Sequence, residues 1–76
     1  MIVLKLPVVS GKEAIKALEK AGFKLVKIRG SHAKLKKDTY TVIVPLHDEL
    51  SKGTLLAIIR QAGLTKQQFL ELLKDP

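Results

Sequence analysis

Hydrophobic residues in the first part of the chain recur every three or four positions, behind a typical helix start. Ser10 and Glu13 have the spacing of a capping box, in which each side chain accepts a hydrogen bond from the other residue's backbone N–H. The apolar residues that follow, with lysine and glutamate between them, are Ala14, Ile15, Leu18 and Ala21. Gly22 suits the left-handed position that often ends a helix. The pattern predicts a helix within residues 10–22.

Three strand-like runs joined by short turns follow this helix. The first run, residues 23–29, is rich in strand formers, but the adjacent Leu25 and Val26 leave open which of its faces points inward. The last run ends at Pro45, which has no N–H for a ladder. Because tight turns join antiparallel neighbours, we expect an antiparallel meander with strands at residues 23–29, 32–37 and 40–45.

The second of these runs alternates clearly between apolar and polar residues. Ala33 and Leu35 lie on one face, and the other face carries His32, Lys34 and Lys36. A sheet of this kind buries one face against helices and leaves the other in solvent. We therefore expect the histidine and the two lysines on the open face.

Two further helices complete the predicted fold. One is expected from about Ser51 to Gly63, and the other begins at a second capping box formed by Thr65 and Gln68. The order helix, three strands, helix, helix predicts an α+β fold with its helices packed on one face of the sheet. We expect one domain over residues 1–76, with residues 1–5 as an apolar extension.

The charge balance favours an acidic partner. Fourteen lysines and arginines against seven acidic residues give a formal net charge of +7, as expected for a protein that meets nucleic acid, an anionic membrane surface or an acidic protein. Cysteine is absent, and two histidines without a carboxylate at ligand spacing do not make a zinc site, so no metal or other cofactor is expected. The sequence has no run of the ~20 apolar residues that cross a bilayer, so we expect a cytoplasmic protein.

His32 is the strongest candidate for chemistry. Its predicted neighbours Lys34 and Lys36 disfavour the imidazolium form, which leaves the ring able to accept a proton near pH 7, and they attract a polyanion. A general base within a phosphate-attracting patch is the minimum equipment for cleaving RNA, whose 2′-hydroxyl becomes the nucleophile. The alternative is a histidine that only hydrogen-bonds in a turn, beside lysines that provide solubility.

A series of short motifs over residues 6–73 resembles the HicA family of mRNA-interferase toxins, which have a fold like that of the double-stranded-RNA-binding domain. Each motif is weak alone, but six in the same order and at matching spacings are specific. They are Ser10-Gly11-Lys12-Glu13, Ala21-Gly22-Phe23, Gly30-Ser31-His32, Val44-Pro45-Leu46-His47, Lys52-Gly53-Thr54-Leu55 and Gln61-Ala62-Gly63-Leu64. Residues 1–5 lie outside the resemblance.

The resemblance implies an endoribonuclease that acts on mRNA without a metal and is blocked by a HicB-like antitoxin. The catalytic histidine of the family's Gly-Ser-His turn falls on His32. Two other functions remain open: a non-catalytic double-stranded-RNA-binding module, and an interaction protein whose charge serves to meet an acidic partner. The sequence leaves the oligomeric state open.

The remaining catalytic and binding roles are less sharply defined by the sequence. Lys34 and Lys36, with Arg29, are candidates to offset charge on the reacting phosphate. Ser31 either completes the turn or donates to a phosphate. His47 is a candidate for protonating the leaving oxygen, or it caps the second helix or bonds the loop after Pro45; a water is the alternative acid. Two further lysine groups either bind RNA or are only solvated: Lys52 at a helix N-terminus, and Lys12, Lys16 and Lys20 on the first helix.

Overall fold

The structure is a computed structural model that describes residues 7–74. In chain order its elements are α1 (Gly11–Lys20), β1 (Lys24–Arg29), β2 (His32–Lys37), β3 (Tyr40–Pro45), α2 (Lys52–Gln61) and α3 (Lys66–Lys74). This order confirms the predicted α+β fold. The expected extension at residues 1–5 lies outside the described residues.

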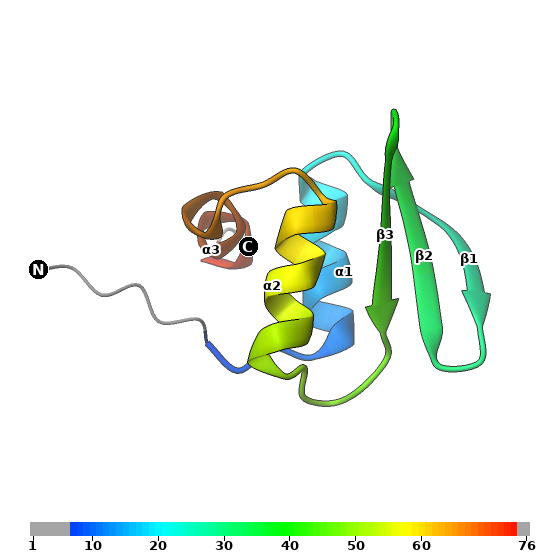
Figure 1. The fold of residues 1–76 in the computed structure, drawn as a ribbon, viewed down its shortest axis with the longest axis horizontal. Helices are drawn as coiled ribbons and strands as arrows, with labels where there is room; N and C mark the ends of the chain where they lie inside the picture. Colours follow the sequence, from blue (N-terminus) through cyan, green and yellow to red (C-terminus); the bar gives the residue numbers. More distant parts are fainter. Residues whose placement is uncertain (1–6, 75–76) are drawn as a thin grey trace, which may run out of the picture.

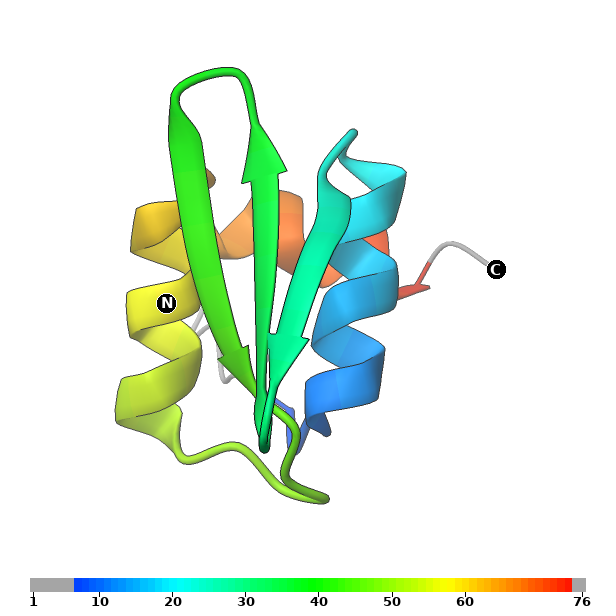
Figure 2. The ribbon, with the colours of Figure 1, turned by 90° about the vertical axis from the view of Figure 1, so that its right-hand side faces the viewer.

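The helices cover one face of the sheet and leave the other open (Figures 1 and 2). The strands form an antiparallel sheet in the order β1-β2-β3. Helices α1 and α2 pack directly on it, and α3 packs against these two helices on the side away from the strands. In Figure 2 the uncovered face of the sheet is turned toward the viewer. A functional surface on the strands is therefore reached without moving any element.

The register of β2 and β3 places small and branched residues opposite one another on the inner face. Ala33 lies opposite Val44, and Leu35 lies opposite Val42. All four side chains are fully buried. They share one core with helix residues, of which the most buried are Ala14, Ala17, Leu18, Leu55, Ile58 and Phe69. The alternation predicted for β2 is confirmed.

A β-bulge in β1 resolves the face that the sequence left open. The register shifts between Leu25 and Lys27, so Val26 is an extra residue without a partner on β2. A bulge puts the residues on its two sides out of simple alternation. As a result, Lys24 and Lys27 share the outer face although they are three residues apart, and Arg29 joins them by ordinary alternation after the bulge.

The N-termini of α1 and α3 confirm the predicted capping boxes. In α1, Ser10 Oγ accepts from Glu13 N at 3.1 Å and Glu13 Oε1 accepts from Ser10 N at 3.0 Å. The Thr65–Gln68 box before α3 has the same reciprocal pair, at 3.1 and 2.8 Å. Each box satisfies two backbone N–H groups that the helix cannot. Helices α1 and α3 thus begin where the sequence places them.

Candidate functional site

A tight hairpin places His32 at the beginning of β2. Gly30 has a φ of 60°, a left-handed value that favours glycine and suits the first central position of a two-residue hairpin turn. His32 is exposed and lies between two partners in the ladder, Arg29 on β1 and Pro45 on β3. The imidazole therefore lies on the outer face of the sheet, at the end of the strands where the hairpin turns.

A shallow hollow extends from His32 across all three strands. It has a volume of ≈ 360 Å³ and is lined by Lys27, Arg29, His32, Ala33, Lys34 and Ile43. Lys27 lies directly opposite Lys34 in the ladder. None of the residues that line the hollow is acidic. The hollow is therefore suited to an anion and is open enough for part of a polymer.

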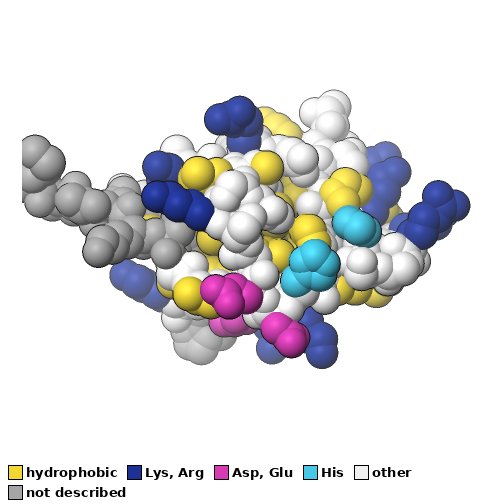
Figure 3. Space-filling view, turned by 60° about the horizontal axis from the view of Figure 1, so that its bottom comes forward, with side chains coloured by type: hydrophobic (Ala, Val, Ile, Leu, Met, Phe, Trp, Pro, Cys, Tyr) yellow, Lys and Arg dark blue, Asp and Glu magenta, His cyan; other side chains and the backbone are white. Residues whose placement is uncertain are grey.

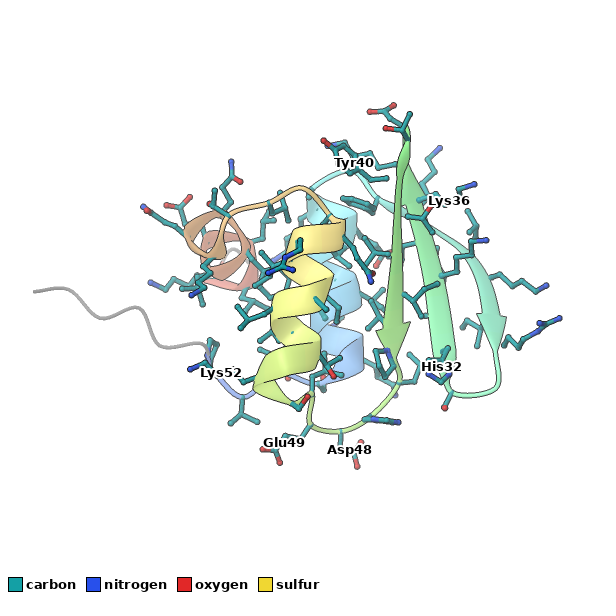
Figure 4. The ribbon with its side chains drawn as sticks, viewed as in Figure 1. His32, Lys36, Tyr40, Asp48, Glu49 and Lys52 are labelled. Atoms are coloured by element: carbon teal, nitrogen blue, oxygen red, sulfur yellow. The ribbon has the colours of Figure 1, made fainter. Side chains whose placement is uncertain are left out.

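The charge of the surface changes from basic to acidic beyond the His32 end of the strands. Figure 4 shows His32 and Lys36 toward opposite ends of β2, with Asp48 and Glu49 on the loop near the His32 end. The side chains of all four residues are exposed. An anionic chain is attracted toward Lys36 and repelled beyond His32.

The second histidine is brought to the same end of the molecule by two backbone hydrogen bonds. Leu46 N donates to Ser31 O at 2.6 Å, and Gly11 N donates to His47 O at 2.9 Å. The first bond fixes the residue before His47 against the residue before His32. Figure 3 shows the two histidine side chains next to each other on one exposed face, close to acidic side chains. The structure thus brings together two histidines that are distant in the sequence.

Other lysines have structural contacts or lie elsewhere. Lys37 Nζ donates to Ala21 O at 2.6 Å and lies 5.9 Å from the centre of the Phe23 ring. Lys20 Nζ donates to Leu72 O at 3.1 Å and so links α1 to α3. In Figure 4, Lys52 lies at the start of α2 and points away from the sheet. The structure does not bring these lysines to His32.

Sequence reasoning missed Lys24, Lys27 and Ile43 as members of the outer face. For the two lysines the bulge is the reason, because simple alternation puts Lys24 and Lys27 on opposite faces of β1. The apolar pair at residues 25–26 was the available signal, since it breaks the alternation of a half-buried strand. Lys36, by contrast, lies where the alternation of β2 placed it.

Two further observations concern chemistry and location. Within residues 7–74, no three His, Asp or Glu side chains are grouped so that they could hold a metal ion. No helix in the described part of the chain is long and apolar enough to span a membrane.

The fold and this site define a small α+β protein with one open cationic sheet face, a histidine at the end of that face and a second histidine on the loop after β3. A family model described as "HicA toxin of bacterial toxin-antitoxin" matches residues 11–64. Because the match spans well over half of the chain, the protein belongs to the HicA toxin family. Helix α3 lies beyond the matched range.

A solved structure supports the same assignment. It is described as a toxin–antitoxin complex from Streptococcus pneumoniae, and one of its chains is 37% identical to this chain with a TM-score of 0.65. The similarity covers 72% of this chain and 97% of that chain. No curated protein gave a significant match.

Gly11 holds the loop that carries His47 against α1. A Cβ added at Gly11 would overlap the carbonyl oxygen of Pro45 and lie 3.0 Å from Leu46 Cα. These are backbone atoms, so the collision cannot be relieved by a side-chain rotation. Only glycine permits this close approach while its N–H reaches His47 O.

We therefore expect Gly11→Ala to destabilise the protein by about 1–3 kcal/mol, the usual range for overpacking. Gly53→Ala is the matched control, because it also lies in the first turn of a helix and has nothing within 4 Å of the added Cβ. Alanine there should be neutral or stabilise by up to about 1 kcal/mol. Urea unfolding of both variants measures the difference, and equal effects would contradict the close-approach explanation.

Proposed function

We propose that this toxin cleaves RNA on the open face of the sheet, without a metal, with His32 as the general base. One observation carries the proposal: an exposed histidine stands at the end of a hollow that is otherwise lined by cations and apolar residues. Such a site attracts a phosphodiester and holds a proton acceptor beside it. Membership of a toxin family agrees with an activity of this kind.

The proposed reaction uses the RNA's own nucleophile. His32 accepts the proton of a 2′-hydroxyl while the oxygen forms a bond to the adjacent phosphorus. The bond from phosphorus to the 5′-oxygen then breaks, and that oxygen takes a proton. The products are a 2′,3′-cyclic phosphate and a 5′-hydroxyl, so no water is consumed and no metal is needed for the step.

Cations around His32 stabilise the charge that develops on the phosphorus. Arg29 is the direct ladder partner of His32, and Lys34 is the next residue on the same face of β2. Fixed positive groups at the reacting phosphate are commonly the largest contribution to catalysis of this type. Ser31, exposed in the hairpin turn, is a further candidate donor to a phosphate oxygen.

His47 is the proposed general acid. It lies on the same exposed face as His32 (Figure 3), and the hydrogen bond from Leu46 N to Ser31 O holds their backbones together. A protonated imidazole there can donate to the 5′-oxygen as it leaves.

We also propose that a HicB-like antitoxin with an acidic contact surface covers this face. The related chain was solved as part of a toxin–antitoxin complex. Complementary charge speeds the association of two proteins and makes it depend on salt. Occupation of the open face by the antitoxin would exclude RNA sterically.

The first test is incubation of the purified protein with RNA in EDTA. We expect cleavage by the wild type and a loss of about 10²–10⁴-fold in rate for His32→Ala, the usual contribution of a general base. The far-UV spectrum of the variant should be unchanged, because His32 is exposed and contributes nothing to the core. Lys66→Ala, an exposed change on α3, serves as the control.

The outcomes separate the alternatives. An unchanged rate for a folded His32→Ala protein rules out the catalytic role. RNA binding without any cleavage by the wild type supports the non-catalytic RNA-binding module, and neither binding nor cleavage supports the interaction protein.

The second test isolates His47 with a substrate whose leaving group needs no acid. We expect His47→Gln to slow cleavage of ordinary RNA by about 10²-fold or more. RNA with sulfur in place of the leaving 5′-oxygen should be cleaved by His47→Gln at close to the wild-type rate. His32→Gln should fail on both substrates. Equal losses of His47→Gln on both substrates would show that His47 is not the acid.

A further inference from the structure

The outer face of β1 and β2 is a ladder of like charges. Three successive cross-strand pairs face solvent there, and five of their six members are lysine or arginine: Arg29–His32, Lys27–Lys34 and Lys24–Lys36. On β3 the residues of this face are uncharged, namely Pro45, Ile43 and Thr41. None of the outer-face residues in the described ladders is acidic. We call the three pairs the cation ladder.

Directly opposed like charges oppose folding, because their Cβ atoms lie about 4.5–5.5 Å apart. Lys37 and Lys20 show how this chain satisfies a lysine in the folded state, with hydrogen bonds to Ala21 O and Leu72 O. The lysines of the cation ladder instead face one another across exposed strands. A phosphate placed between two opposed lysines would remove their repulsion and bind both.

The spacing of the ladder fits an extended polymer. Same-face residues along a strand are about 6.6 Å apart, twice the rise per residue. This distance is close to the separation of successive phosphates in an extended single strand of RNA. In a duplex the phosphates follow a helical path. That path curves away from a straight row of lysines within a short distance.

We propose that the cation ladder is a set of three successive phosphate subsites that holds extended, single-stranded RNA along β1 and β2. The proposal rests on the proposed function only in placing the reacting phosphate at the Arg29–His32 pair. The next two phosphates lie at Lys27–Lys34 and Lys24–Lys36. The β1 lysines thereby become binding residues, which the sequence alone did not identify.

The sign of the charge differs between the two ends of the cation ladder. Asp48 and Glu49 lie near the His32 end, and the ladder ends at Lys36 (Figure 4). The bound strand is therefore held mainly on one side of the reacting phosphate. Nucleotides on the other side meet the acidic loop and gain little affinity.

The test measures binding of single-stranded oligoribonucleotides to the His32→Ala protein, which does not consume them. Lys24→Gln combined with Lys27→Gln should reduce the slope of log affinity against log salt by up to about 1.4, because each phosphate contact to a single strand contributes about 0.7 and the opposed Lys36 and Lys34 remain. The control carries the same charge change on exposed positions of α1, Lys12→Gln with Lys16→Gln. Its slope should not change.

A second measurement extends the oligonucleotide one phosphate at a time. Affinity should rise with the first two phosphates added on one side of the phosphate at the Arg29–His32 pair and then level off. Equal gains on both sides, or equal slope changes in the β1 and α1 variants, would overturn the ladder. The ladder would also be overturned if the β1 variant bound RNA with unchanged affinity but associated more slowly with the acidic antitoxin.

These binding results are independent of catalysis. If the wild-type protein does not cleave RNA, the proposed function fails, but the slope and length measurements still decide whether the cation ladder binds phosphates. If the ladder variants bind normally while the wild type cleaves, only the ladder is wrong.

Discussion

The pairing register of β2 is the constraint on which the rest of the structure depends. Ala33 and Leu35 are completely buried against their partners on β3 and against the helices. A shift by one residue would turn Lys34 and Lys36 into the core, where unpaired charges are very unfavourable. The same register that buries the small residues therefore forces His32 and both lysines onto the open face. Fold and site follow from one alternation.

The size of the protein explains why the site is a surface. A domain of 76 residues buries only about 60% of its extended-chain area, and the helices use one sheet face for the core. The remaining face is large, exposed and edged by a hairpin, which suits a polymer better than a small metabolite. The opposed lysines on this face weaken the fold slightly. This is expected at positions where the type of residue serves binding rather than stability.

The sequence predicts local features well and long-range ones poorly. The Ser10–Glu13 box and the alternation of β2 depend on neighbours within a few residues, and both were correctly predicted. The facing of β1 was left open by the sequence, because a bulge at Val26 depends on pairing with another strand. The place of His47 depends on hydrogen bonds to residues far away in the chain, and the sequence could name it only by residue type. The catalytic roles themselves stay predictions.

The most direct test of the account is the chemistry of the cleaved ends. An RNA oligonucleotide cut by the purified protein in EDTA should end in a 2′,3′-cyclic phosphate and a 5′-hydroxyl, because the 2′-oxygen is the proposed nucleophile. A single 2′-deoxy substitution at the mapped cleavage position should abolish the cut at that bond. Cleavage of the substituted bond, or products with a 5′-phosphate, would show that water attacks instead and would contradict the role given to His32.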